Sequence, residues 1–193
     1  MTEGIETTRW PEGWGRSKAG RFDQISIALH WLTVATVTVQ ITTAELIIRG
    51  QGDVALLLLT HRSMGTLTWI IVAARLVWRH NFAYLPPFPA GMPKRQQHIA
   101  KLNEYGLYGF LLLQPLSGLA MMLCRGRPFS LFFWQVPALL SPVPSVSAVF
   151  RSIHELGAWA LLMLIGLHAA AALLHGVALR DGVLQRMLPW TRR

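Results

Sequence analysis

Near its carboxyl end the chain reads Arg151-Ser-Ile-His154-Glu-Leu-Gly-Ala-Trp-Ala-Leu-Leu-Met-Leu-Ile-Gly-Leu-His168-Ala-Ala-Ala-Ala-Leu-Leu-His175. This segment supplies roughly the 20 apolar residues that a helix needs to cross the hydrocarbon of a bilayer. It also contains histidines, and an imidazole inside a membrane is costly and usually marks a functional site. His154 and His168 are 14 residues apart, close to four helical turns, so they lie on one stripe about 21 Å apart along the axis. The helix therefore offers one ligand near each face of the membrane.

The composition is that of an integral membrane protein. Hydrophobic residues make up 52% of the 193 residues and charged residues only 14%, whereas soluble domains carry about 25% charged residues. The net charge of +9 is spread over short segments between apolar runs, which is typical of membrane proteins. Because no basic module with interleaved aromatic residues is visible, we expect a lipid bilayer as partner and no nucleic acid.

Apolar runs predict an all-α, integral membrane four-helix bundle. Even the first run, which is rich in β-branched residues, is expected to be helical because an open sheet cannot satisfy its edges in lipid. The segment 125–150 is apolar and aromatic but broken by prolines, so we expect it to cap one end of the bundle. The expected organisation is a polar tail over 1–23, a transmembrane domain over 24–178 with spans at about 24–46, 54–78, 99–124 and 152–178, and a basic tail over 179–193.

The distribution of Lys and Arg predicts the orientation. Twelve of these residues lie in the N-terminal tail, the 79–101 loop and the tail after residue 178, and four lie in the connections on the other side. Positively charged segments stay in the cytoplasm. We therefore expect both termini to be cytoplasmic.

Depth in the bundle predicts which histidines meet. His30 comes early in an outward-running helix and His168 late in an inward-running one, so both are expected toward the cytoplasm. His61 and His154 both come early in inward-running helices, so both are expected toward the outside. Paired imidazoles are the axial ligands of low-spin haem iron, which suits electron transfer, whereas zinc would need four close ligands. We therefore expect two haems, one on His61/His154 and one on His30/His168.

Four arginines are candidate partners of haem propionates, because guanidinium groups form charge-assisted hydrogen bonds with carboxylates. They are Arg62, Arg75, Arg125 and Arg127. Arg75 has a second interpretation as a topology anchor at the membrane interface. A single histidine in a span is often only a hydrogen-bonded packing residue, but four that fall into depth-matched pairs favour ligation.

Three further residues near the cytoplasmic side are candidate quinone contacts. His175 lies seven residues beyond His168, where it could contact a propionate or a quinone, or be an ordinary interfacial histidine. Lys101 and Tyr108, together with Glu104, share one face at the start of the third span. That face could bind a quinone headgroup or be a plain polar face at the interface.

Several motifs point to a known family. They are Ile25-Ser-Ile-Ala-Leu-His30-Trp31-Leu, His61 followed by Gly65, Arg75-Leu76, Gly118-Leu-Ala-Met121 with Arg125-Gly126-Arg127-Pro128, His154-Glu155, Gly166-Leu-His168-Ala-Ala-Ala-Ala-Leu-Leu-His175 and Arg186-Met187-Leu188-Pro189. With these motifs the chain resembles the bacterial cytochrome b561 family of small four-helix di-haem membrane proteins, over about residues 20–190. The motif of the fourth span is the most specific of them.

The resemblance implies two b-type haems on the positions of His30, His61, His154 and His168, electron exchange with ubiquinone, and a place in the bacterial inner membrane. In the superoxide oxidase type of the family, superoxide on the outer side donates the electron, and the outer arginines would attract such an anion. We therefore expect electron transfer between ubiquinone and superoxide or a periplasmic redox protein. The alternative is a haem-bearing anchor subunit of a dehydrogenase or hydrogenase, and a third interpretation is a haem transporter or structural membrane protein.

Overall fold

Long helices make up most of the protein. The structure, a computed structural model, describes residues 20–89 and 91–189, so the expected tails are seen only in part and residues 1–19 and 190–193 lie outside it. The described residues form α1 (Gln24–Ile48), α2 (Val54–Asn81), α3 (Lys94–Cys124) and α4 (Pro144–Leu173). All four helices are long and apolar enough to cross a membrane, which confirms the predicted four-helix membrane fold.

The first two helices begin at acidic caps. The carboxylate of Asp23 accepts hydrogen bonds from the backbone N–H of Ser26 (2.9 Å) and from its hydroxyl (2.7 Å). Asp53 accepts from the backbone N–H groups of Ala55 (2.9 Å) and Leu56 (3.2 Å). A carboxylate at this position satisfies N–H groups that have no partner in the helix and interacts favourably with its dipole. Local sequence therefore sets where α1 and α2 begin.

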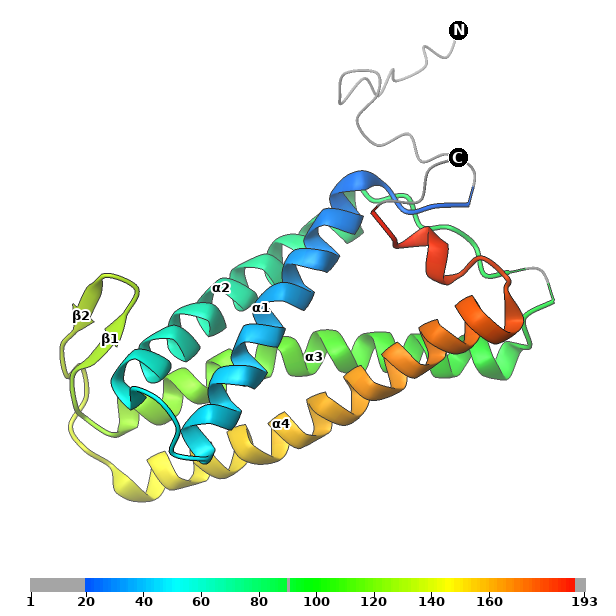
Figure 1. Ribbon diagram of the computed structural model, residues 1–193. Coiled ribbons are helices and arrows are strands. Elements are labelled where there is room, and N and C mark those ends of the chain that lie inside the picture. The colour runs from blue at the N-terminus through cyan, green and yellow to red at the C-terminus, as the bar shows by residue number, and fades with distance from the viewer. Residues whose placement is uncertain (1–19, 90, 190–193) are drawn as a thin grey trace, which may run out of the picture.

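The helices form two antiparallel hairpins (Figure 1). Helix α1 packs along α2 and α3 packs along α4, whereas α2 meets α3 over a shorter stretch and α1 makes no extensive contact with α4. The small buried core lies where the two hairpins meet, around Val72, Tyr108 and Leu111. Many large apolar side chains point outward and are exposed, as expected for helices whose outer faces contact lipid.

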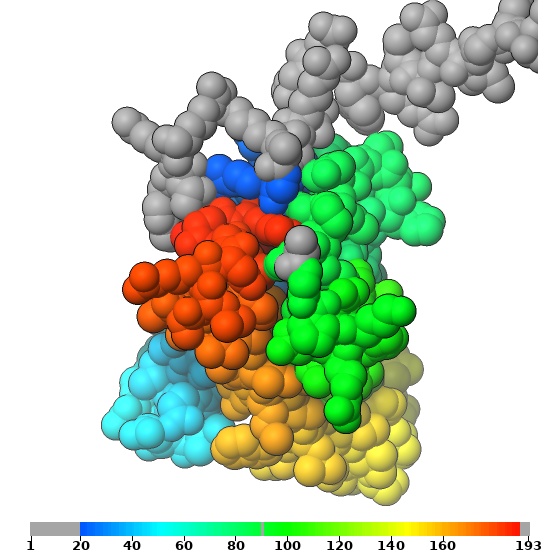
Figure 2. All heavy atoms as spheres, turned by 90° about the vertical axis from the view of Figure 1, so that its right-hand side faces the viewer, coloured from blue at the N-terminus to red at the C-terminus, as the bar shows by residue number. Residues whose placement is uncertain are grey.

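The two ends of the bundle differ. We term them the terminal end, where Phe22 meets Arg186, and the hairpin end, which carries the β-hairpin of residues 129–136. At the terminal end the start of α1 lies beside η2 (Leu184–Arg186), while η1 (Leu174–Leu179) continues from the end of α4. Here the backbone N–H of Phe22 donates to the carbonyl of Arg186 (3.4 Å), and the indole of Trp31 donates to the carbonyl of Met187 (2.8 Å). Figure 2 views the molecule from this side, with η2 (red) between the start of α1 (blue) and the end of α4 (orange).

A short β-hairpin covers the opposite end, where residues 125–150 were expected to form a cap. Strand β1 (Phe129–Leu131) pairs antiparallel with β2 (Trp134–Val136), with Ser130 opposite Gln135. The backbone N–H of Phe132, in the turn, donates to the hydroxyl of Ser63 on α2 (2.7 Å). The hairpin was not predicted, because strands of three residues carry no readable periodicity. Helix α4 then begins at Pro144, ahead of the expected residue 152, because proline is well suited to the first turn of a helix.

The buried cap of α1 is expected to stabilise the fold more than the exposed cap of α2. Asp23 is only 4% exposed and also accepts a hydrogen bond from the indole of Trp78 on α2 (3.0 Å). We expect Asp23→Ala to lower the free energy of unfolding by about 2–3 kcal/mol, since it removes a cap and leaves a buried indole N–H unpaired. Asp53→Ala should cost about 1 kcal/mol. The free energy of unfolding of each variant can be measured in mixed micelles. A larger loss of stability for Asp53→Ala than for Asp23→Ala would contradict this role of Asp23.

Candidate functional site

Two pairs of histidines lie between the helices, one toward each end of the bundle. His30 of α1 and His168 of α4 form the terminal-end pair, with ring centroids 6.1 Å apart. His61 of α2 and His154 of α4 form the hairpin-end pair, with ring centroids 6.3 Å apart. Helix α4 supplies one member of each pair. These are the partners that depth along the sequence named, and their role as ligands stays a prediction.

The ring of His61 is held by the neighbouring helix α1. Its Nδ1 atom lies 3.2 Å from the carbonyl oxygen of Gln40 and 3.1 Å from the hydroxyl oxygen of Thr43. A carbonyl oxygen can only accept, so Nδ1 carries the hydrogen. In a neutral imidazole the lone pair then lies on Nε2, where it is free to bind a metal. The hydrogen bond thus selects the tautomer that a ligand needs.

The ring of His154 is held in the same way by helix α3. Its Nδ1 atom lies 3.0 Å from the carbonyl oxygen of Gln114 and 3.1 Å from the hydroxyl oxygen of Ser117. In both helical hairpins, α1/α2 and α3/α4, the Nδ1 hydrogen is accepted by the backbone carbonyl of a glutamine and by a hydroxyl three residues later. Both rings of the hairpin-end pair therefore present Nε2 as the free nitrogen.

The two glutamines were not predicted from the sequence. Each fits beside a glycine of the facing helix: an added Cβ at Gly65 would lie 3.5 Å from Oε1 of Gln40, and one at Gly157 would lie 2.5 Å from Oε1 of Gln114. The amide of Gln114 also donates to the carbonyl of His154 (3.0 Å). The available signal was an amide side chain in the middle of an apolar span, which is costly in lipid and rarely without a role.

The terminal-end pair is not held in this way. Within the described part of the chain neither His30 nor His168 makes a side-chain hydrogen bond, and Nδ1 of His30 is buried without a partner. The ring of Trp31 packs edge-on against His30, with centroids 5.7 Å apart. A buried polar atom without a partner costs about 1–3 kcal/mol. The terminal-end pair therefore lacks the hydrogen bonds that select the tautomer and fix the rings of the hairpin-end pair.

The spacing within both pairs fits one metal ion held between two imidazoles. Histidine nitrogen binds first-row metals at about 2.0 Å, which places the centroids of two opposed rings about 6 Å apart. Among the described residues, no group of three or more His, Cys, Asp and Glu side chains lies close enough to hold a metal ion. The remaining ligands would therefore come from a cofactor. Haem supplies its own equatorial nitrogens and takes two imidazoles as axial ligands, so the residues present fit it.

The space between α1 and α4 also fits a flat cofactor. These helices make no extensive contact, and residues 166–170 of α4, which include His168, are exposed. A Cβ added at Gly166 would meet no atom within 4 Å. Small side chains here leave an open face instead of a packed interface between helices. A macrocycle bound between His30 and His168 would cover that face.

The candidate arginines lie at both ends of the bundle. Arg75 stacks over the ring of Tyr108, 5.3 Å from its guanidinium carbon to the ring centroid, and interacts electrostatically with both rings of the terminal-end pair. Arg62 lies over an aromatic ring of β1 at 5.9 Å. Arg125 and Arg127 are exposed beside the β-hairpin. The structure therefore brings one cation to the terminal-end pair and gathers three at the hairpin end.

His175 lies beyond the regular part of α4, in the π-helical turn η1, a feature frequent at functional sites. Its Nδ1 atom is 2.5 Å from Oδ2 of Asp181, which sequence analysis did not single out because it lies in a tail without periodic pattern. Desolvation opposes ionisation of Asp181, but hydrogen bonds from His175 and from the backbone N–H of Val183 hold the pKa of its carboxyl below the usual value. The carboxylate fixes the imidazole and leaves Nε2 available to another partner.

The other candidate quinone contacts lie at the start of α3. Lys101 pairs with Glu104 (3.3 Å), which also pairs with Arg79 of α2 (2.8 Å). Tyr108, one turn deeper, is buried beneath Arg75. Lys101 and Glu104 thus form a charged cluster at the rim of the terminal end, and Tyr108 lies inside the bundle.

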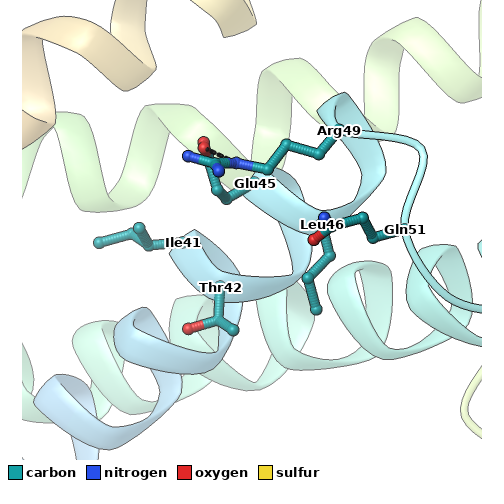
Figure 3. A pocket seen from close by; sticks show the side chains of 6 residues that line it. All are labelled: Ile41, Thr42, Glu45, Leu46, Arg49 and Gln51. Carbon is teal, nitrogen blue, oxygen red and sulfur yellow. Dashed lines mark hydrogen bonds and ion pairs between the residues drawn. The ribbon is translucent and has the colours of Figure 1, made fainter.

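A surface pocket lies at the end of α1 and the turn after it (Figure 3). Glu45 and Arg49 form an ion pair beside it (2.6 Å). The residues that line it are Ile41, Thr42, Glu45, Leu46, Arg49 and Gln51. No histidine is among the six, and its charged groups neutralise each other, so this pocket is not the candidate site.

Comparison with known proteins points to one family. The family model described as prokaryotic cytochrome b561 matches residues 21–190. Cytochrome b561 homolog 1 of Escherichia coli (strain K12) is 32% identical over 175 residues, which cover 88% of this chain and 97% of the relative. A probable superoxide oxidase CybB of Yersinia pestis is 28% identical over 178 residues, covering 89% and 98%. Cytochrome b561 homolog 2 of Escherichia coli (strain K12) is 27% identical over 183 residues, covering 87% and 91%.

Gly118 of α3 tests how firmly His154 is held, because an added Cβ would lie 3.1 Å from Cε1 of that ring. The ring is bonded to α3 through Nδ1 and cannot move away freely, so we expect Gly118→Ala to cost about 1–2 kcal/mol of stability through overpacking. Gly109→Ala on the same helix is the control, since its Cβ would meet no atom within 4 Å and alanine favours the helix. Thermal unfolding in detergent measures both, and equal effects would show that the ring is free to shift.

Proposed function

Because the chain belongs to the prokaryotic cytochrome b561 family, which implies b-type haem, we propose that it binds two such haems. One would lie between His61 and His154 and the other between His30 and His168. The observation that carries this proposal is the spacing of the two pairs, 6.3 and 6.1 Å between ring centroids. The tautomer selected at the hairpin-end pair and the open face of α4 support it.

The four helices and the family make the chain a multi-pass bacterial membrane protein. We propose the inner membrane as its location, with the terminal end in the cytoplasm. The Lys and Arg residues of the tails and of the 79–101 loop support this orientation. The pair His30/His168 would then lie near the cytoplasm and the pair His61/His154 near the outside.

Electron transfer between ubiquinone and a donor on the outer side is the function that this arrangement supports best. When bound, a haem iron with two imidazole ligands carries one electron at a time and leaves no position for oxygen. One relative is named a probable superoxide oxidase, so we propose superoxide as the donor. Two superoxide anions would each lose one electron and leave as dioxygen, while ubiquinone takes up two electrons and two protons.

The residues at the hairpin end would bring the anion to the protein. Arg62, Arg125 and Arg127 form a positive surface beside the β-hairpin, which raises the local concentration of a small anion. The same guanidinium groups are candidate partners of haem propionates at this end. Both roles need positive charge that is not neutralised. No carboxylate of the described residues lies within ion-pair distance of Arg62, Arg125 or Arg127.

The residues at the terminal end would bind the haem propionate and the quinone. Arg75 is the candidate propionate partner there. With a hydrogen on both ring nitrogens, His175 would donate from Nδ1 to Asp181 and from Nε2 to a quinone oxygen, and the Nε2 proton could pass to the reduced quinone, leaving a neutral imidazole. Lys101 and Tyr108 are further candidate contacts of the headgroup.

A haem-bearing anchor subunit of a dehydrogenase or hydrogenase remains the second candidate. The β-hairpin supports it, because Phe133 is 97% and Trp134 is 70% exposed. Exposed aromatic patches often mark protein interfaces. A soluble redox subunit that co-purifies from native membranes would favour this function over a self-contained oxidase.

The haem content of the purified protein tests the proposal directly. Dithionite-reduced minus oxidised spectra should give two b-type haems per chain. His168→Ala should remove one haem and retain the other, because it breaks only the terminal-end pair. The exposed His98, whose Nδ1 bonds within its own helix to the carbonyl of Lys94 (2.7 Å), provides the control His98→Ala, which should keep both. A wild-type protein without haem would refute the proposal.

The identity of the donor is tested by stopped-flow measurement of superoxide decay with ubiquinone present. We expect the wild-type protein to accelerate the decay and to form reduced quinone. His61→Ala should lose both effects, because it removes a ligand of the outer haem. A rate no greater than that of the detergent blank would exclude superoxide while leaving haem binding untouched.

A further inference from the structure

The two histidine pairs differ in what surrounds their rings. Building on the proposed function, we propose that Thr43 and Ser117 lower the reduction potential of the haem at the hairpin-end pair. Arg75 raises the potential of the haem at the terminal-end pair. These three are positioning residues, since they act through the imidazoles or through charge and do not bind iron. The chain would thereby make its hairpin-end site the harder one to reduce.

At the hairpin-end pair each ring donates its Nδ1 hydrogen to two oxygen atoms. The hydroxyl of Thr43 gives its own hydrogen to a carbonyl of α1, either Val39 (2.9 Å) or Gln40 (3.0 Å). The hydroxyl of Ser117 gives its hydrogen to the carbonyl of Gln114 (2.9 Å). Each hydroxyl oxygen therefore presents a lone pair to the imidazole. Pulling on the Nδ1 hydrogen makes Nε2 more basic, and a more basic ligand stabilises ferric over ferrous iron.

Burial makes these hydrogen bonds hard to replace. Thr43 is 6% and Ser117 is 3% exposed, so bulk water does not reach either hydroxyl. Hydrogen bonds are also electrostatically stronger in a medium of low dielectric than in water. Loss of either hydroxyl should therefore change the basicity of its histidine without compensation.

At the terminal-end pair the second ligand nitrogens have no such acceptor. Neither imidazole ring, that of His30 or that of His168, bonds to an oxygen atom of residues 20–89 or 91–189. Instead Arg75, whose guanidinium lies over the ring of the core residue Tyr108 (5.3 Å), is placed between the helices so that its charge acts on both rings. A nearby cation favours the redox state with less positive charge, which is ferrous iron. Both differences raise the potential of this site above that of the other.

Charged groups of both signs also act on the rings of the hairpin-end pair. Arg62 acts there on His61 alone, and Glu155, which is paired with Arg151 (2.7 Å), acts on His154. The terminal-end pair also has one carboxylate in range, Glu104, which acts on His168. Arg125 and Arg127 also lie at the hairpin end, but of the candidate arginines only Arg75 acts on both rings of a histidine pair.

This order of the two reduction potentials would give electron transfer through the protein a preferred direction. A one-electron donor at the hairpin end would give its electron to the site of lower potential, and the electron would be more stable at the terminal end. The quinone candidates His175 and Lys101 lie at that end. The surroundings of the four histidines would therefore favour flow from the outer side toward ubiquinone over the reverse.

Redox titration of the purified, haem-loaded full chain tests the proposal. His168→Ala, which keeps only the haem of the hairpin-end pair, should show the lower of the two wild-type midpoint potentials. Thr43→Val and Ser117→Ala should each raise the lower potential and leave the higher one in place. Arg75→Gln should lower the higher potential alone. Thr43→Ser, which restores a hydroxyl, should return the lower potential toward the wild-type value.

Thr38→Val is the matched control, because the hydroxyl of Thr38 is on the same helix but bonds only to the carbonyl of Val34 (2.8 Å). It should shift neither potential. Two haems with the higher potential on the hairpin-end pair would overturn this proposal while leaving the proposed function standing. Unshifted potentials in both hydroxyl variants would also overturn it. Protein that binds no haem would instead refute the proposed function, and this inference with it.

Discussion

An imidazole between membrane helices depends on finding partners for its polar atoms, because lipid offers none. The structure meets this need unequally. His61 and His154 each use Nδ1 to bond a carbonyl and a hydroxyl of the neighbouring helix. That bond fixes the orientation of the ring and leaves one free nitrogen on each side of a gap that suits a metal ion. The placement of the helices, the glycines beside the glutamines and the proposed chemistry all depend on this constraint.

The two helical hairpins solve the same problem in the same way. In α1 the acceptors are Gln40 and Thr43, and in α3 they are Gln114 and Ser117, with the same spacing in both. Helix α4 differs from the others because it contributes to both histidine pairs and makes no extensive contact with α1. A group bound between α1 and α4 would therefore replace packing between helices, and its binding would stabilise the bundle by mass action.

Much of the architecture could be predicted from the sequence. Long apolar runs identified the helices, because length and hydropathy suffice where only helices can satisfy the backbone in lipid. Position along each run placed His30 beside His168 in depth, because every helical residue advances by a constant rise. The β-hairpin at Phe129–Val136 escaped prediction, since strands of three residues leave no periodic pattern. Asp181 also escaped, because its contact with His175 depends on the path of an irregular tail.

The number of spans, their alternating direction and the depth of each histidine follow from the order of residues alone, since each needs only hydrophobicity and a constant rise per residue. The rotation of each helix about its axis does not, because it depends on how side chains from several helices pack together. That rotation put the carbonyl of Gln40 against His61 and the carbonyl of Gln114 against His154, and left the ring of His30 without a hydrogen bond to any described residue. The different surroundings of the two pairs therefore became visible only in the folded bundle.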